Sequence, residues 1–420
     1  MGDSRNTGIR TFDWQGWWRF ALVSLIFFHI TASTFTSLGV ALPFMVDELS
    51  WSWSNAGMGF SVLAFMVGIT GRVPAWTLQR FGTGATFGIG GLTMAVGFGL
   101  LAISASLIEY FLGAALAGLG YTLCATVPGV SVINHSLPHR RSFAIGAYMT
   151  IGGLGGVAGP LIVTGLVSLT GSWRVHWWSM AVSIAILVLL ALMTFGGRRE
   201  SGAGQKPATK STEEKRAKRV HTTADQWSLK DVLRTPQYFV IVAAWTMTLF
   251  GGVTTNSWAV THMGTLGISI TIAAGALSAH AFINAFSRSF GGALATWIDP
   301  KWLLVSALAA EIVGMLALSS ADNMLTIVLF AFGEGYGFGM CLFATTILLV
   351  NYYGPKEAPK TMGTMHMITT VAMLGPVLGG IVADTFGGFA GLFRVYAVLL
   401  LVCLIAAAML KPPALPLKRH

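Results

Sequence analysis

The chain alternates between long apolar stretches and short polar ones, and this alternation defines the elements we expect. An apolar stretch of about 20 residues can cross a bilayer as an α-helix, and a longer one can cross it with a tilt. The stretches that fit this pattern are residues 20–46, 55–78, 83–104, 108–133, 143–169, 176–196, 237–260, 269–298, 302–319, 324–352, 361–386 and 389–410. The pattern therefore predicts twelve transmembrane helices.

A polar stretch divides these segments into two sets of six. We expect residues 1–196 to form an N-terminal six-helix bundle and residues 237–420 a C-terminal one. Residues 197–236 between them are rich in Lys, Arg, Glu, Gly and Thr, which predicts a cytoplasmic linker. Within it, residues 227–234 (WSLKDVLR) are expected to form a short amphipathic helix at the membrane surface.

Composition places the chain among membrane proteins. Of its 420 residues, 54% are hydrophobic and 10% are charged, and the mean hydropathy is +0.69. Soluble domains carry about 25% charged residues. We therefore predict an all-α, multi-pass membrane protein whose main surroundings are a lipid bilayer.

The net charge of +10 is unevenly distributed along the chain. Basic residues gather at both chain ends and in alternate connections, at Arg80, residues 139–141, 198–234, Lys301, Lys356 and Lys360. The other connections are mostly acidic or neutral. This is the positive-inside pattern, and it predicts cytoplasmic termini. We also expect a location in the inner (plasma) membrane of a bacterium. Membrane topology thus accounts for the charge, and no nucleic-acid partner is expected.

Several residues recur at an offset of about 216 positions, which indicates duplicated halves. Arg288 falls on Arg72 in the predicted second segment, and the other pairs are Asn351 with Asn134, Gly363 with Gly146, and Gly375-Pro376 with Gly159-Pro160. If the halves are related by an axis along the membrane normal, the two arginines lie at equal depth on opposite walls. Two facing guanidinium groups would make a site for an anion.

A polar stripe runs along the predicted eighth helix. His280, Asn284 and Arg288 are spaced i, i+4 and i+8, so they share one helical face. A charged side chain inside a membrane is costly unless it faces a polar interior, so the stripe predicts a helix that lines a watery cavity. The alternative is an Arg288 that reaches the lipid headgroups near the helix end.

Two further segments carry polar side chains in apolar surroundings. His29 begins a stripe with Ser33, Thr36 and Ser37, which suggests a cavity wall in the first half or a packing contact. Glu334 and Tyr336 lie in GEGYGFG, whose glycines form two overlapping faces for close helix packing. Desolvation favours the neutral form of a carboxyl group, so Glu334 could bind and release a proton, or serve as a structural partner. Glu311 fits a structural role better, as does His366.

The six-plus-six arrangement, with Gly-Pro in the fifth and eleventh segments, resembles the major facilitator superfamily over essentially the whole chain. Within it, the run Asn284-x-x-x-Arg288-Ser-Phe-Gly-Gly is similar to the monocarboxylate transporter and oxalate–formate antiporter group. So are residues 50–57 (SWSWSNAG) and 233–239 (LRTPQYF). The chain departs from the pattern at Asn284, where members commonly carry an acid. It departs again at Arg80, which lacks the usual acidic residue before it.

The resemblance implies a secondary active transporter that works by alternating access, and the paired arginines favour a small organic anion such as a monocarboxylate, with protons as co-substrate. The expected substrate-binding residues are Arg288, Arg72, Asn284, His280, His29 and Tyr336, and the candidates for proton coupling are Glu334, His29 and His280. The alternatives are a nitrate/nitrite-like inorganic anion porter, an anion exchanger, a drug/proton antiporter and a non-transporting membrane sensor. The sequence contains no recognisable nucleophile–base pair, metal-ligand cluster or phosphate-binding loop, so we expect no enzyme, cofactor or metal.

Overall fold

The structure is a computed structural model that describes residues 13–196, 223, 227–295, 297–354 and 357–414. The first half contains α1 (Trp14–Ser33), α2 (Phe35–Leu49), α3 (Trp53–Ile69), α4 (Val73–Ile103), α5 (Leu107–Cys124), α6 (Thr126–Ser136), α7 (Arg141–Thr170) and α8 (Trp173–Phe195). The second contains α9 (Leu229–Val232), α10 (Pro236–Thr265), α11 (Ile270–Leu294), α12 (Pro300–Ser319), α13 (Met324–Tyr353), α14 (Ala358–Thr369), α15 (Gly375–Phe386) and α16 (Ala390–Ala408). Short 3₁₀ turns, η1 (Pro138–Arg140) and η2 (Thr370–Leu374), complete the described elements.

The predicted all-α membrane fold is confirmed. Among the described residues, eleven helical spans are long and apolar enough to cross a membrane, and α3 is a shorter apolar helix. Three of the spans consist of two consecutive segments, α1 with α2, α5 with α6, and α14 with α15. The spans together with α3 correspond to the twelve predicted segments. The predicted linker, residues 197–236, lies largely outside the described residues, and its helix is the single turn α9, shorter than expected.

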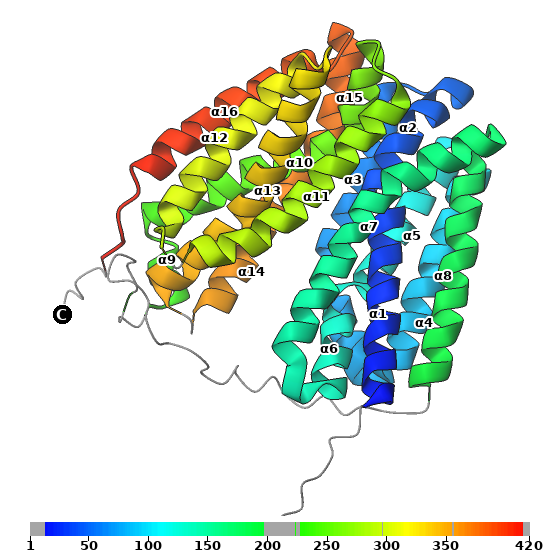
Figure 1. Ribbon diagram of the computed structural model, residues 1–420, viewed down its shortest axis with the longest axis horizontal. Helices are drawn as coiled ribbons and strands as arrows, with labels where there is room; N and C mark the ends of the chain where they lie inside the picture. Colours follow the sequence, from blue (N-terminus) through cyan, green and yellow to red (C-terminus); the bar gives the residue numbers. More distant parts are fainter. Residues whose placement is uncertain (1–12, 197–222, 224–226, 296, 355–356, 415–420) are drawn as a thin grey trace, which may run out of the picture.

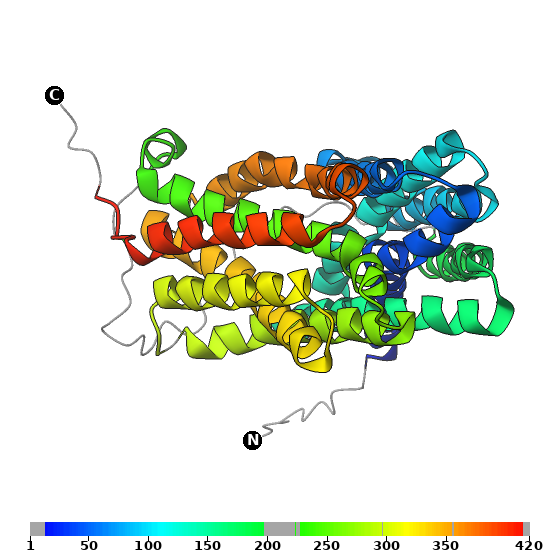
Figure 2. The ribbon, with the colours of Figure 1, turned by 90° about the horizontal axis from the view of Figure 1, so that it is seen from above.

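The helices form two bundles, α1–α8 and α10–α16, which lie side by side along the long axis of the molecule (Figure 2). The bundles meet near one end and diverge toward the other, where α1 begins (Figure 1). Most contacts between them are made by α3 with α15 and η2, α7 with α11, and α2 with α10. We call the end where α3 meets α15 the closed end.

Small residues allow the two bundles to approach closely where α7 meets α11. A Cβ added at Gly153 of α7 would lie 3.1 Å from the Cβ of Ala285, and one added at Gly156 would lie 3.7 Å from that of Ala281. A methyl group at Gly153 would therefore be crowded against α11, whereas one at Gly156 would make an ordinary van der Waals contact. Of the two Gly-Pro pairs related by the offset of about 216, only Gly375-Pro376 interrupts a span, because Pro160 lies inside an unbroken α7.

The structure corrects the predicted position of Arg72. The second predicted segment runs to residue 78, but α3 ends at Ile69 and Arg72 stands at the N-cap of α4. Pro74 explains this boundary, because a proline is favoured in the first turn of a helix and restricts the residues before it. Gly82, with φ of 83°, then kinks α4 just before the predicted third segment. Arg72 thus lies in a connection, whereas Arg288 lies within α11.

Candidate functional site

A cavity of 1590 Å³ lies between the two bundles. From the first bundle it is lined by Phe27, Thr31, Phe35, Thr36, Tyr121 and the glycine face of α7, among others. From the second it is lined by Asn256 of α10, by His280, Asn284 and Arg288 of α11, and by His366, Thr369 and Thr370 at the end of α14. The cavity therefore occupies the space between halves that a membrane carrier would use for its substrate.

The polar stripe of α11 forms one wall of this cavity. Arg288 Nε donates a hydrogen bond to Asn284 Oδ1 at 3.0 Å, one helical turn away. The amide therefore orients the guanidinium group, whose other four N–H groups are on the two η nitrogens. Tyr121 of α5 lies within electrostatic reach of Arg288 from the opposite bundle. Three predicted site residues, His280, Asn284 and Arg288, are thus brought together, as their spacing requires.

The remaining charge on the cavity wall is also positive. Arg72 lines the cavity from the α3–α4 connection, and Lys360 lines it from the start of α14 in the other bundle. Lys360 Nζ also contacts the carboxylate of Glu357 at 3.0 and 3.1 Å. Among the described lining residues there is no Asp or Glu. The cavity wall therefore carries three cationic side chains and no carboxylate, which favours an anionic ligand.

The sequence did not indicate that Lys360 lines the cavity. It lies in the connection after Asn351, where a basic residue is explained by the positive-inside pattern. Asn256 gave no signal either, since it stands alone in an apolar run. His366 was expected to make a packing contact, yet it lies on the cavity wall with Thr369 and Thr370. All three positions depend on how α10 and α14 face the opposite bundle.

His280 connects the cavity with a buried carboxyl group. Its side chain is 2% exposed and lines the cavity, and its Nε2 contacts Glu334 Oε2 of α13, a contact that is an ion pair when the imidazole is protonated. Glu334 is fully buried and does not line the cavity. The glycines of α13 make this arrangement possible: Gly335 lies directly against the backbone of His280, and Gly339 against Asn284. One of the two predicted glycine faces is therefore the contact surface for α11.

His29 does not lie where its stripe predicts. It is buried between α1 and α8, and its Nε2 is 2.6 Å from Ser183 Oγ. The stripe assumed one continuous helix, but Thr34, with φ of −105° and ψ of −103°, separates α1 from α2. Thr36 still reaches the cavity, whereas His29 is on a different face. The expected cavity position of His29 is therefore corrected.

Tyr336 is also absent from the described lining residues. Its hydroxyl group and that of Ser306 on α12 share a hydrogen bond of 2.9 Å. Since Tyr336 follows Glu334 by two residues, it is turned by about 200° around α13 relative to the carboxyl group. It packs the bundle from the α12 side, so its expected position on the cavity wall is corrected in the same way.

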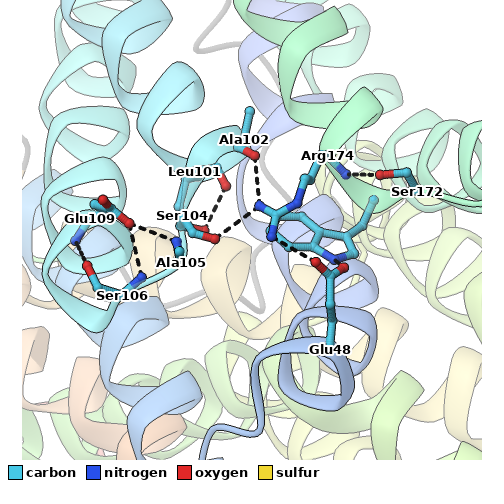
Figure 3. A network of polar contacts seen from close by, with 10 residues as sticks. Glu48, Leu101, Ala102, Ser104, Ala105, Ser106, Glu109, Ser172 and Arg174 are labelled. Carbon is cyan, nitrogen blue, oxygen red and sulfur yellow. Dashed lines mark hydrogen bonds and ion pairs between the residues drawn. The ribbon is translucent and has the colours of Figure 1, made fainter.

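The closed end of the cavity is fastened by polar groups. Within the first bundle, Arg174 of α8 donates to Glu48 Oε1 at 2.8 Å and to the carbonyl groups of Ala102 and Ser104 at 3.0 Å each (Figure 3). Glu48 also accepts a bond from Trp173 Nε1 at 2.6 Å. The ends of α2 and α4 are therefore tied to the start of α8.

Asp384 of α15 fastens the two bundles to each other. Its Oδ1 accepts the N–H of Trp53 at 3.0 Å, and its Oδ2 accepts the N–H of Ser54 at 2.9 Å and the Ser54 hydroxyl group. These are the first N–H groups of α3, which lack partners within their own helix, and a negative charge there also meets the positive end of the helix dipole. Separation of the bundles at this end must break these bonds.

Replacing Asp384 should therefore loosen the closed end. We expect Asp384→Ala to raise the equilibrium constant for opening there by about 2- to 30-fold, because loss of an N-cap costs about 0.5–2 kcal/mol. Distances between spin labels at Asp47→Cys and Phe386→Cys, one exposed position in each bundle, would measure the shift, since Cys124, Cys341 and Cys403 are buried. Asp322→Ala, at an exposed aspartate in the α12–α13 connection, is the control. Unchanged distances in the Asp384 variant would contradict the prediction.

The two-bundle helical fold around a cavity is that of a membrane transporter. The sequence profile described as Major Facilitator Superfamily matches residues 22–350 and 298–420. The chain belongs to this superfamily, whose members are membrane transporters and not enzymes.

The relatives in this superfamily differ in what they carry. The chain is 24% identical over 352 residues to monocarboxylate transporter 4 of Gallus gallus, covering 81% of this chain and 71% of that one. It is 26% identical over 174 residues to "Probable nitrate transporter NarT" of Staphylococcus epidermidis, covering 40% and 44%. It is 30% identical over 107 residues to the dehydrocurvularin exporter of Aspergillus terreus, covering 24% of this chain but only 18% of the exporter.

Solved structures share the fold over nearly the whole chain. A bacterial homologue of the human lysosomal transporter Spinster, in an inward-facing and unoccupied conformation, aligns with a TM-score of 0.73 at 16% identity, covering 94% of this chain and 97% of that one. The nucleoside transporter NupG aligns with a TM-score of 0.70 at 16% identity, covering 94% and 99%. At this identity the likeness concerns the fold alone.

Proposed function

We propose that the protein is a secondary active transporter of a small organic anion, a monocarboxylate or similar carboxylate. The observation that carries this proposal is the charge of the cavity wall: Arg72, Arg288 and Lys360 line it, and the described lining residues include no Asp or Glu. A guanidinium group matches a carboxylate because its planar fork can donate two parallel hydrogen bonds. Arg288, oriented by Asn284, is the proposed anchor.

Alternating access would follow from the way the bundles meet. The cavity lies between them, and the closed end is held by contacts such as that of Asp384 with α3. With basic connections placed in the cytoplasm, the diverging end faces the cytoplasm and the closed end faces outward. The described conformation would then be open to the inside of a bacterial inner membrane, with both chain ends on that side.

Proton coupling is assigned to Glu334 with His280. His280 touches both the cavity and Glu334, so a proton from cavity water can reach a carboxyl group that lies behind the wall. His29, the other candidate, is separated from the cavity lining by its contact with Ser183 and has no part in this proposal. Coupling would bring an anion and a proton across together.

An inorganic anion is the second candidate substrate. The likeness to the nitrate transporter supports it, as does the presence of one arginine in each half. Export of lipophilic cations is disfavoured, because a cation would meet three positive side chains on the cavity wall. The same cavity could also support anion exchange, in which one anion is transported in each direction.

A thermal-shift screen tests the proposed substrate class. A ligand that binds only the folded protein stabilises it by about 2.7 kcal/mol at 100 times its dissociation constant. We expect mono- or dicarboxylates, or nitrate, to raise the melting temperature of the purified transporter, and lipophilic cations to leave it unchanged. Stabilisation by cations alone would overturn the assignment.

A further inference from the structure

Two carboxyl groups are buried together in the second bundle, behind the cavity wall. Glu311 of α12 and Glu334 of α13 are both 0% exposed, and neither lines the cavity. Their helices approach closely because Gly333 and Gly337 of α13 lie against the backbone of α12. Gly337 faces Glu311 itself, with its added Cβ only 2.7 Å from the Glu311 Cβ.

Both carboxyl groups lie against the same turn of α10. A Cβ added at Gly251 would be 3.6 Å from Glu311 Oε1, and one added at Gly252 would be 3.4 Å from Glu334 Oε1. The adjacent glycines of α10 therefore leave room for both side chains. The carboxyl groups interact electrostatically with each other across this space.

Among the described groups that face the two carboxyl groups, one side chain can carry a positive charge. His280 of α11 contacts Glu334, and Thr248 of α10 donates a hydrogen bond to Glu311 Oε2 at 2.8 Å. The other titratable neighbours are thiols, Cys341 of α13, which is 3.3 Å from Thr248 Oγ1, and Cys403 of α16. No described Lys or Arg forms an ion pair with either carboxyl group.

These contacts set the charge that the cluster can carry. One imidazolium group can balance one carboxylate, and a second carboxylate would remain ionised and buried without a cation. That state is costly, and a protein avoids it by keeping the group protonated. The imidazolium contact belongs to Glu334, so the uncompensated group is Glu311.

We propose that Glu311 and Glu334 form a single proton-binding site in which Glu311 keeps a proton at neutral pH. Glu334 with His280 is the exchangeable part, because His280 alone of the three reaches the cavity. When cavity water protonates the Glu334 carboxylate beside an imidazolium group, the cluster gains one positive charge near the anion site. The role of this cluster in transport rests on the proton coupling proposed above. The presence of a proton on Glu311 does not depend on that proposal.

The difference between the infrared spectra of wild type and variant, each measured on the full-length transporter in a detergent without carbonyl groups, tests this without any substrate. The C=O stretch of a neutral carboxylic acid is separate from carboxylate bands, and we expect one such group per molecule at neutral pH. Glu311→Gln, which is close to isosteric with the protonated acid, should remove the band and still unfold at the wild-type temperature. Glu334→Gln should keep it.

Two results would overturn the proposal. One is a wild-type spectrum without a neutral carboxylic acid at neutral pH. The other is loss of the band in Glu334→Gln with retention in Glu311→Gln, which would place the proton on the other side chain. If the band behaves as expected but no anion is taken up in any assay, the proton site stands and only the proposed substrate class fails.

Discussion

Arg288→Gln should reduce anion affinity and uptake by about 30- to 3000-fold. Arg288 is exposed in the open cavity, and a bound anion would be enclosed with it between the two bundles. Removal of one partner from such an enclosed, hydrogen-bonded charge pair costs about 2–5 kcal/mol, and each 1.4 kcal/mol is about a factor of 10. Glutamine keeps a polar side chain of similar reach, and the stripe neighbour Asn284 stays in place. The measurement is the dissociation constant of the best anion from the thermal-shift screen, followed by its uptake into proteoliposomes.

Two further variants sharpen this test. Arg288→Lys keeps the charge but loses the planar fork, so we expect an intermediate loss if the anion is held by two parallel hydrogen bonds. Arg394→Gln is the matched control, because Arg394 is an exposed arginine of α16 that is absent from the cavity lining. Wild-type affinity in Arg288→Gln, with normal amounts in the membrane, would remove the anchor from the proposed site.

Much of the fold follows from hydropathy alone. A bilayer requires about 20 apolar residues per helical crossing. The predicted count of twelve segments therefore agrees with the eleven spans and the shorter apolar helix α3 of the structure. The α11 stripe was predicted correctly for the same kind of local reason. His280, Asn284 and Arg288 lie within one unbroken helix, where a spacing of four residues keeps side chains on one face.

The misplaced residues lie where a helix ends or breaks. The sequence places His29 in the cavity because Thr34 looks like part of a continuous helix. It places Arg72 inside a helix because the second segment is extended past Ile69, although Arg72 does line the cavity, from the α3–α4 connection. Such breaks depend on contacts with neighbouring helices, which a pattern of apolar positions does not contain. The hydropathy pattern therefore predicted the number of crossings better than their ends.

The pairing of Glu311 with Glu334 could not be predicted for a different reason. Each carboxyl group stands alone in its own segment, 23 positions apart in the sequence, and only the glycine contact of α12 with α13 brings them together. The motif GEGYGFG showed that two faces of α13 would be packed closely. It did not show which helices would occupy them.

The second large effect should follow removal of the exchangeable proton site. Protons and anion bind to one protein, so each changes the affinity for the other by the same factor, and a coupling of about 1–3 kcal/mol corresponds to about 5- to 150-fold. If the two move together, protonation near Glu334 favours the anion, and wild-type affinity should rise by such a factor as the pH falls. Glu334→Gln fixes this side chain in a neutral form. Its affinity should stay near the low-pH value at every pH.

Transport assays separate this effect from a loss of folding or binding. Counterflow of labelled against unlabelled anion needs no net proton movement, so Glu334→Gln should retain it, whereas uptake driven by a pH gradient should fall to the level without a gradient. Glu109→Gln, at the start of α5 in the other bundle, should behave like the wild type in both assays. Gradient-driven uptake that survives in Glu334→Gln would move the coupling away from this carboxyl group. His280, the described residue that contacts both Glu334 and the cavity, would then be the group to replace next.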